Sequence, residues 1–413
     1  MRHFFTSLVV VSALFLFAGC SKDLSPLTPT KSRPLTPLEK RLVSRSNVFG
    51  LNLFKEIVRQ DTQENIFVSP LSVSMALGMT LNGAAGETEK AMKSTLGFGD
   101  MDLHAVDETY KSLIAYLLQL DPKVIFQLAN SIWYRNTFHF ESSFFDVTRK
   151  YFNAEVRGLD FSNPASVGIV NDWVAQHTND KIKKILDRID PQDVMFLINA
   201  VYFKGLWTYQ FKKEVTQDDD FYLPDGSSFK VKMMNQAGTF DYLETDQFQA
   251  IDLPYGDGAF SMTIFLPKPG VALDSLIAQL TPETWANWTG SLEKKKGGIL
   301  LPKFKLKYGI QLNDVLKSLG MGIAFGKQAN FTRMSKNGGL FISYVRHKTF
   351  VKVDEEGTEA AAVTIVGVRV TSVGGGSEGF KMIVNRPFLC VIRERQSNTV
   401  LFVGKIGHPT WEE

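Results

Sequence analysis

Residues 354–372, DEEGTEAAAVTIVGVRVTS, stand where a turn is expected, directly after the alternating stretch 341–353. A strand that ends is normally followed by a short cluster of Gly, Pro, Asn or Asp. This segment instead has Gly357 near its start, followed by small residues and then mostly β-branched residues, and the next proline is Pro387. Any fold assigned to this sequence must therefore explain a strand-like segment in the position of a loop.

The order of residues within the segment gives it two different faces. Successive strand residues point to opposite sides, so with Thr358 taken as inward, one face is small, then β-branched, and uncharged. That face comprises Thr358, Ala360, Ala362, Thr364, Val366, Val368 and Val370. The charged residues Glu359 and Arg369 fall on the other face, and no proline interrupts the segment. The pattern favours entry into a sheet between two existing strands, where about 14 residues would span roughly 45 Å.

Elsewhere, helices are predicted early in the chain and strands late, without a regular strand–helix–strand alternation. Helices are predicted over residues 38–58, from Ser69-Pro70 with the serine as cap, over 87–96 up to Gly97, and once or twice within 166–185. Strands are predicted over residues 125–133, 194–203, 260–266, 299–307, 341–353, 382–392 and 399–403. This arrangement indicates an α+β fold. No linker or repeat follows residue 40, so one domain is expected over residues 40–413.

The first 20 residues have the pattern of a secretory signal. Arg2 and His3 precede an apolar run over residues 8–17, which is too short to span a membrane as a helix. The run ends in Phe-Ala-Gly-Cys, which resembles a bacterial lipobox. Residues 1–19 are therefore expected to be a lipoprotein signal peptide and Cys20 the lipidated residue, and the alternative is a plain signal with an incidental cysteine.

A proline-rich stretch follows. Residues 24–37 hold four prolines, so residues 20–39 are expected to be the lipidated N-terminus and a stiff tether. Two or more acyl chains anchor a protein stably, which predicts an outer-membrane lipoprotein of the cell envelope, facing the periplasm or the cell surface. Cys390 then has no disulfide partner, and its apolar surroundings predict a buried small hydrophobic residue.

Composition and motifs argue against an enzyme and against nucleic-acid binding. The 46 basic and 43 acidic residues give no electrostatic reason to expect a nucleic acid. The six histidines are far apart, neither an HExxH motif nor a P-loop occurs, and no metal or cofactor is expected. A GxSxG match at residues 375–379 would need a following helix to form a nucleophile elbow, and a strand pattern follows instead.

Two polar residues interrupt apolar strand patterns. Asn199 lies within MFLINAVYF, and His347 lies within the long strand that ends at Val353. A buried polar group without a partner costs about 1–3 kcal/mol. Each is therefore expected to have a partner, and they can be partners of each other.

Several motifs, taken in order along the chain, resemble the serpin family. They are NIFVSPLSVSMALGMTLNGAAGETEKAM (65–92), ANSIWY (129–134), INAVYFKGLW (198–207), PKFKLKY (302–308), VDEEGTEAAAVT (353–364) and NRPFLCVIRERQSNTVLFVGKIGHP (385–409). The resemblance covers nearly the whole chain after residue 40. It implies three β-sheets, about nine helices and an exposed reactive-centre loop.

The resemblance also assigns roles to residues 354–372. Its hinge would be Glu355, Glu356, Gly357, Thr358, Glu359, Ala360, Ala361 and Ala362. In inhibitory serpins a protease attacks the loop and forms an acyl-enzyme, and the cut loop then inserts into the main sheet. The protease is carried along and deformed before it can deacylate. The native state would be metastable, with strain released on insertion.

Serpin-like positions that control opening of the main sheet are Ser69, Asn199 and His347, a region called the shutter. Trp207 matches the breach, the upper end of the sheet where insertion begins. Ordinary core packing is the alternative role for Trp207, and the two are compatible.

The family's usual spacing, about 17 residues from Glu355, puts the scissile bond at Thr371–Ser372. Small or β-branched residues there suit elastase-like or subtilisin-like proteases. Arg369 is the alternative for trypsin-like proteases. The gap from hinge to Pro387 is longer than usual, and counting back from Pro387 would move the bond toward Gly376.

Three further expectations complete this interpretation. Residues 101–121 contain one lysine and four acidic residues where some serpins bind heparin, so no heparin site is expected. The protein is expected to be a monomer whose partners are serine proteases. A non-inhibitory serpin that acts as a binding or chaperone-like protein is the competing hypothesis, although the inward hinge positions Thr358, Ala360 and Ala362 carry none of the bulky, charged or proline residues typical of such proteins.

Overall fold

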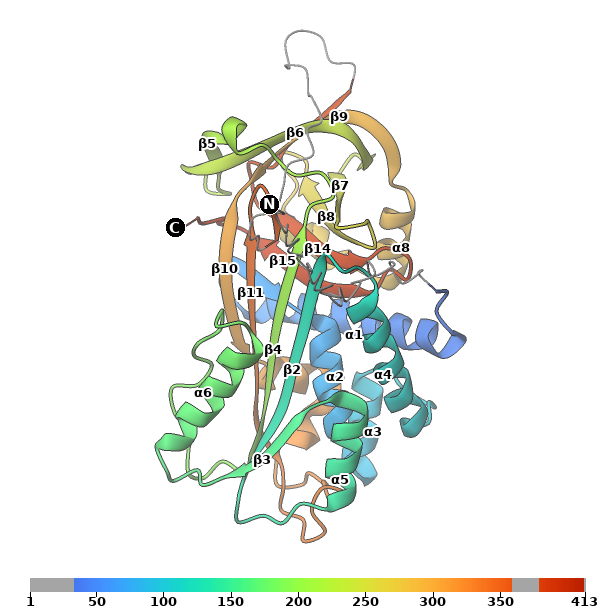
Figure 1. The fold of residues 1–413 in the computed structure, drawn as a ribbon, viewed down its shortest axis with the longest axis vertical. Helices are drawn as coiled ribbons and strands as arrows, with labels where there is room; N and C mark the ends of the chain where they lie inside the picture. The colour runs from blue at the N-terminus through green and yellow to red at the C-terminus, as the bar shows by residue number, and fades with distance from the viewer. Residues whose placement is uncertain (1–32, 359–378, 412–413) are drawn as a thin grey trace, which may run out of the picture.

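The computed structural model describes residues 33–358 and 379–411. Within these ranges it contains nine α-helices, and helices α1 to α6 precede most of the strands (Figure 1). The helices are α1 (Pro37–Gln60), α2 (Pro70–Leu81), α3 (Gly86–Thr95), α4 (Leu103–Gln119), α5 (Ser142–Val147), α6 (Ala165–His177), α7 (Leu273–Ala278), α8 (Pro282–Gly290) and α9 (Asn313–Leu316). None of the helices in these ranges is long and apolar enough to cross a membrane.

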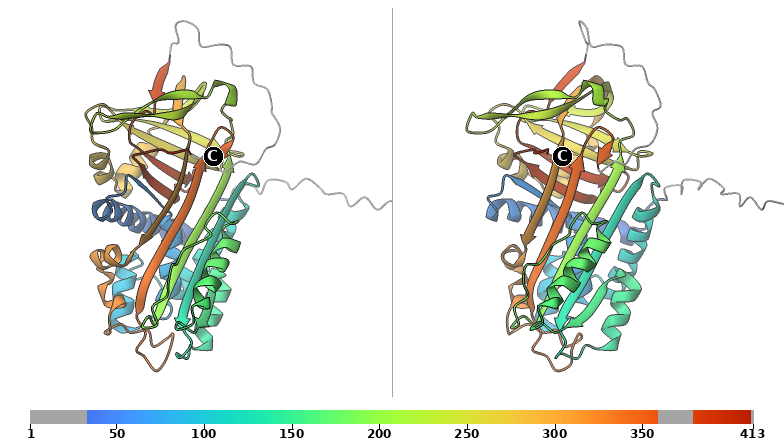
Figure 2. Two further views of the ribbon diagram at one scale, coloured as in Figure 1. Left: turned by 90° about the vertical axis from the view of Figure 1, so that its left-hand side faces the viewer. Right: turned by 60° about the vertical axis from the view of Figure 1, so that its left-hand side comes forward.

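A six-stranded sheet runs along the length of the molecule (Figures 1 and 2). Its order is β10 (Phe304–Gln311), β11 (Ile342–Val353), β12 (Gly357–Thr358), β4 (Met195–Leu206), β2 (Val124–Arg135) and β3 (Glu155–Leu159). Helix α6 covers one face of this sheet, and α2 packs against the other. The central strands are therefore buried on both sides.

A nine-stranded sheet forms the other layer. Its order is β1 (Asn65–Val68), β15 (Val400–Ile406), β14 (Phe388–Glu394), β8 (Phe260–Pro267), β7 (Phe248–Tyr255), β6 (Ser228–Glu244), β9 (Glu293–Pro302) and β13 (Phe380–Ile383), with β5 (Gln217–Tyr222) paired to β6. Among the described residues, hydrogen bonding thus forms two continuous sheets where three were expected. The 17-residue β6 explains this, because it pairs with β5, β9 and β7 in turn.

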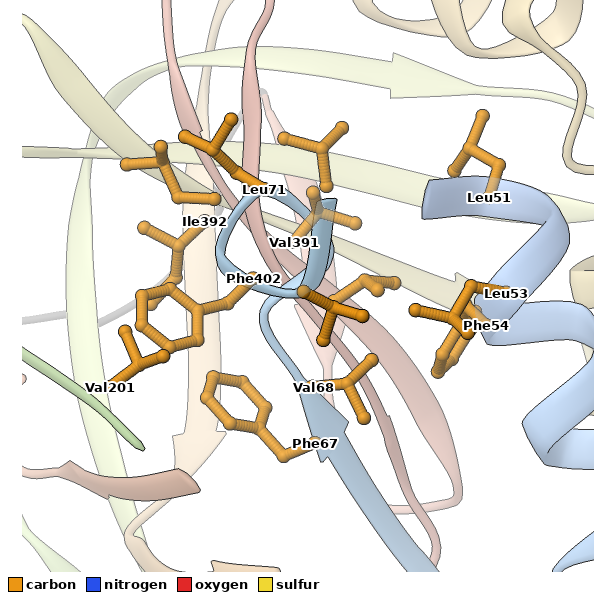
Figure 3. Packing of buried hydrophobic residues seen from close by; sticks show 14 of the residues in the cluster. Leu51, Leu53, Phe54, Phe67, Val68, Leu71, Val201, Val391, Ile392 and Phe402 are labelled. Carbon is orange, nitrogen blue, oxygen red and sulfur yellow. The ribbon is translucent and has the colours of Figure 1, made fainter. Parts of the chain in front are cut away.

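The main core lies between α1, α2 and the two sheets. Figure 3 shows Leu53 and Phe54 of α1 near Val68 of β1, with Phe67 facing Phe402 of β15. The rings of Phe67 and Phe402 stack at a centroid distance of 5.3 Å. This packing fixes α2 and β1 behind the six-stranded sheet.

The structure confirms most of the predicted elements and corrects several. Residues 299–307 belong to two strands, β9 and β10, that meet at Lys303 and lie in different sheets. Residues 382–392 likewise belong to two strands, β13 and β14. Residues 166–185 contain only one helix, α6. Five helices, α4, α5, α7, α8 and α9, and the strands β1, β3 and β5 to β7 were not predicted.

Two single-residue predictions have different outcomes. Cys390 is fully buried, as predicted, and its burial raises the pKa of the thiol. Ser69 does stand at the N-cap position of α2, but its side chain makes no capping hydrogen bond. The Ser69 hydroxyl is buried without a hydrogen-bond partner in the described part of the chain.

Candidate functional site

Two residues of the strand-like segment form β12, which lies between β11 and β4 at one end of the six-stranded sheet. Thr358 is opposite Val353 of β11 and opposite Gly205 of β4, and it runs antiparallel to both. Beyond this point β11 and β4 pair directly with each other, in parallel, from Ile342 to Phe350 of β11. β12 therefore occupies only the first positions between β11 and β4. A longer strand could continue from it in the same direction between these two strands.

A tight turn joins β11 to β12. The Asp354 carboxylate accepts hydrogen bonds from the backbone N–H groups of Glu356 (3.1 Å) and Gly357 (3.3 Å). A Cβ on Gly357 would lie 2.1 Å from the carbonyl oxygen of Gly205 and 2.7 Å from the Cα of Leu206. Only glycine can approach β4 so closely, which explains the single glycine at this position of the sequence.

The acidic residues of the turn are neutralised by lysines from three other segments. The pairs are Asp354 with Lys352, Glu355 with Lys303 and Glu356 with Lys213. Glu355 is buried, its carboxylate lies 2.9 Å from the Lys303 ammonium, and it accepts a hydrogen bond from Thr216 at 2.8 Å. Burial alone would raise the pKa of Glu355, but these two donors outweigh it and the pKa is lowered. The hinge is thus held by one largely buried charge pair, Glu355 with Lys303, and by two pairs whose lysines are more exposed.

Trp207, the predicted breach residue, contacts the hinge directly. Its indole N–H donates to the carbonyl oxygen of Asp354 at 2.9 Å, and its backbone N–H donates to the carbonyl oxygen of Glu356 at 2.9 Å. Its ring stacks on Tyr255 at a centroid distance of 4.5 Å. The Tyr255 hydroxyl in turn lies 2.6 Å from the Thr358 hydroxyl. Trp207 therefore combines core packing with support of the turn.

The C-terminal segment adds a contact that sequence reasoning missed. The ring centroid of Trp411 lies 4.1 Å from the Lys303 ammonium and 5.3 Å from that of Lys352. The backbone N–H of Lys305 donates to the carbonyl oxygen of Thr410 at 2.8 Å, which fixes the tail beside β10. Both lysines that pair with Asp354 and Glu355 are therefore covered by one aromatic ring.

The predicted shutter residues meet halfway along the six-stranded sheet. His347 and Asn199 are opposite each other on β11 and β4, and their side chains hydrogen-bond, which confirms the predicted partnership. The backbone N–H of Ser69 donates to His347 Nε2 at 3.1 Å, so His347 Nδ1 carries the proton toward Asn199. Asn199 Nδ2 also donates to Ser72 and Asn130. Asn130 interrupts the apolar pattern of β2, so the reasoning applied to Asn199 would have found it.

Burial determines the protonation state of this cluster. His347 is 1% exposed, and burial lowers its pKa from 6.5 to about 3. The imidazole is therefore neutral at physiological pH, which its single-donor, single-acceptor bonding requires.

The remaining predicted site residues lie outside the described residues. They are Cys20, Glu359, Ala360, Ala361, Ala362, Arg369, Thr371 and Ser372. The GxSxG match also lies mostly outside, and the residues that follow it form strand β13, not a helix.

Comparison with known proteins agrees with this geometry. The family model described as serpin (serine protease inhibitor) matches residues 44–409. The leukocyte elastase inhibitor of Sus scrofa is 36% identical over 383 residues, which cover 90% of this chain and all of the relative. Human neuroserpin is 34% identical over 375 residues, which cover 87% of this chain and 90% of the relative.

The same result comes from solved structures. The thermophilic serpin tengpin, in its native state, superposes with a TM-score of 0.83 at 32% identity, over 92% of this chain and 97% of tengpin. The main sheet is opened by β12 at one end and closed where β11 and β4 pair directly, and with these matches it places the chain in the class of serine protease inhibitors that the family model describes. The chain belongs to the serpin family. The family is described as one of serine protease inhibitors.

Proposed function

We propose that this serpin inhibits serine proteases as a suicide substrate: its loop is cleaved to an acyl-enzyme and then inserts between β11 and β4. The observation that carries the proposal is the register around β12. Val353 and Gly205, which flank Thr358, differ by 148 in residue number (353 − 205). The directly paired His347 and Asn199 differ by the same 148 (347 − 199).

Because the two differences are equal, β12 can be extended without shifting either neighbour. In the extended strand Ala360 lies between Val351 and Phe203, Ala362 between Thr349 and Val201, and Thr364 between His347 and Asn199. The buried face of the sheet holds Thr358, Val353 and Gly205. The residues of the inserted strand that point into the protein are therefore the inward residues inferred from the sequence. This inward set holds no charge and starts with small residues, which lowers the steric barrier to entry.

Insertion must break the hydrogen bond between His347 and Asn199. Thr364 arrives between them with a hydroxyl that can donate and accept. The buried polar groups of the shutter therefore keep partners after the sheet has opened, and the desolvation cost of leaving them unpaired is avoided.

The proposed reactive bond is Thr371–Ser372, with Arg369 as the alternative reactive residue. Thr371 favours elastase-like or subtilisin-like targets, and Arg369 would admit trypsin-like ones. Cleavage at Thr371 leaves about 13 residues after Thr358 to insert, which reach about 43 Å at 3.3 Å per residue. That length spans the whole β11–β4 pair.

The proposed location is the cell envelope, as a monomeric outer-membrane lipoprotein attached through Cys20 and facing the periplasm or the cell surface. Arg33 supports a short tether. Its guanidinium pairs with the buried Glu39 at 2.6 Å and lies 4.9 Å from the ring of Tyr116 on α4. If that contact persists, only residues 21–32 link lipid and domain, which limits the separation to about 40 Å.

Incubation of residues 21–413 with pancreatic or neutrophil elastase, trypsin and subtilisin tests the proposal. A band at the summed mass that survives SDS demonstrates trapping, and mass spectrometry of the released peptide fixes the scissile bond. Cleavage without such a band favours the second candidate, a non-inhibitory binding or chaperone-like serpin. Melting of the cleaved form separates the two further, because only insertion raises its melting temperature strongly.

A further inference from the structure

One face of the sheet beside the returning end of the loop carries exposed lysines that lack acidic partners. It is formed by the neighbouring strands β6, β9 and β13 at the upper end of the molecule in Figure 1. We call it the lysine face. Its residues are Ala237, Thr239 and Asp241 of β6, Lys294, Lys296 and Gly298 of β9, and Lys381 of β13.

The pairing registers place these residues on one side. Lys296 is opposite Thr239, and Gly298 is opposite both Ala237 and Lys381. Residues directly opposite each other in a sheet point the same way. Lys296 and Lys381 are therefore about two residues apart along adjacent strands, roughly 7–8 Å.

The charge on this face is not balanced. Lys294 pairs with Asp241 at 3.0 Å. Lys296 and Lys381 are exposed, and neither has a carboxylate within ion-pairing distance in residues 33–358 and 379–411. Among the described residues, two positive charges thus stand beside residues with small side chains.

The opposite side of the same strands is packed, which keeps the lysine face in place. The ring of Phe380 stacks on Tyr242 at a centroid distance of 3.7 Å and contacts Phe240 edge-on at 6.0 Å. A Cβ on Gly297 would lie 2.4 Å from the Phe380 ring. The three strands therefore form a rigid support.

The position of this face connects it with the proposed reactive loop. A Cβ on Gly379, the residue before β13, would lie 2.7 Å from the carbonyl oxygen of Lys296. The chain that leaves β12 at Thr358 thus returns to the sheet against Lys296. A protease that holds residues near 371 in its active site has its rim close to these lysines, since eight residues reach at most about 28 Å.

We propose that the lysine face is a docking surface for target proteases whose active-site rim is acidic. The inference rests on the proposed inhibitory function. It adds a selection among target proteases by the charge of their active-site rim, which the loop sequence alone does not provide. Charges at the edge of an interface act mainly on the association rate and make that rate sensitive to salt.

The test compares the double variant Lys296→Glu/Lys381→Glu with wild type in the full secreted chain. Two proteases that both form the SDS-stable complex are used, one with an acidic and one with a basic active-site rim. The second-order rate constant should fall about 10-fold with the acidic protease at low salt and should rise with the basic one. The difference should shrink in 0.5 M salt, and the moles of inhibitor consumed per protease should not change.

Lys183→Glu/Lys327→Glu is the matched control. Both lysines are exposed, but Lys183 follows α6, and Lys327 follows the 3-10 turn Gly322–Phe325, which packs against α3. Two outcomes would overturn the docking proposal: equal rate changes in the control and test variants, or unchanged rates with both proteases. Neither outcome would contradict the proposed inhibitory function. Failure of the wild type to trap either protease would overturn the proposed function, and the docking proposal with it. The variant Lys296→Gln/Lys381→Gln should give a second-order rate constant between those of wild type and the double glutamate variant. Equal melting temperatures of wild type and all variants would show that the substitutions leave the fold unchanged.

Discussion

The ring of Trp411 lies 4.1 Å from the Lys303 ammonium, and the same ammonium lies 2.9 Å from the buried carboxylate of Glu355. The C-terminal segment is thereby coupled to the hinge through one lysine. A lysine held between an aromatic ring and a carboxylate has two favourable electrostatic contacts, and the ring helps to keep the ammonium beside the carboxylate. This relationship ties the last residues of the chain to the stability of the uncut inhibitor.

Trp411→Ala should accelerate spontaneous loop insertion. Loss of the ring removes a contact of about 1 kcal/mol from the native hinge. At a temperature just below melting, inhibitory activity should decay several-fold faster than in wild type while the protein stays folded. Tyr209→Ala, which removes an aromatic side chain that is 65% exposed, is the control. Equal decay of all three proteins would show that Trp411 does not hold the hinge.

Gly357→Ala should destabilise the native state. The new methyl group would meet the Gly205 carbonyl oxygen at 2.1 Å, so the turn must move away from β4. We expect a loss of about 2–3 kcal/mol in the free energy of unfolding, measured by urea denaturation. Gly168→Ala in helix α6 has nothing within 4 Å and should instead stabilise by about 0.5–1 kcal/mol. A normal midpoint for Gly357→Ala would contradict the close approach.

His347 should make stability depend on pH between about 3 and 6.5. Its pKa is about 3 in the folded protein and 6.5 when unfolded. Below pH 6.5 the unfolded state therefore binds more protons, and stability falls as the pH falls. The loss at pH 5 is about 2 kcal/mol.

Comparison with His347→Gln isolates this contribution. Burial raises the pKa of Asp107 to about 7, so Asp107 acts in the opposite direction and weakens stability as the pH rises from about 4 to 7. The difference in unfolding free energy between wild type and His347→Gln should vary with pH, whereas the contribution of Asp107 should cancel. A constant difference from pH 4 to 8 would show that His347 is not buried as a neutral group.

Ala362→Arg should convert the proposed inhibitor into a substrate. The arginine would have to enter between Thr349 and Val201 on the buried face, where an unpaired charge is strongly unfavourable. Cleavage should continue, while the SDS-stable fraction falls below about one tenth, because insertion is slower than deacylation. Glu359→Gln, on the other face, should remain an inhibitor. Full trapping by Ala362→Arg would mean that position 362 does not insert.

The sequence was sufficient to predict the features that depend on local pattern. The two faces of the segment after Val353 follow from alternation, and the contact between Asn199 and His347 follows from the cost of burying polar groups. Each prediction rests on a rule that acts over a few residues. The place of Trp207 came from the family resemblance, and the structure puts its indole against the turn at Asp354, while its role in starting insertion stays a prediction.

Features that depend on contacts between distant segments were not predictable in this way. The chain passes from one sheet to the other at Lys303 without leaving an extended conformation, so the run from β9 to β10 looks like one strand. Trp411 has no local pattern, because its partners lie on β10 and β11. Helix α8 did have a signal, a capping box from Thr281 to Thr284 with Pro282 at the first turn, but it was not used.

The register of β12 also says how the sheet has to open. From Tyr344 to Phe350, each residue of β11 keeps the same opposite residue on β4 before and after a strand enters between them, so neither half of the sheet slides along the other. The two halves can therefore behave as rigid plates that separate sideways by one strand spacing, about 4.8 Å. A movement of this kind leaves the packing within each half of the sheet unchanged. The whole rearrangement is then confined to the contacts between β11 and β4.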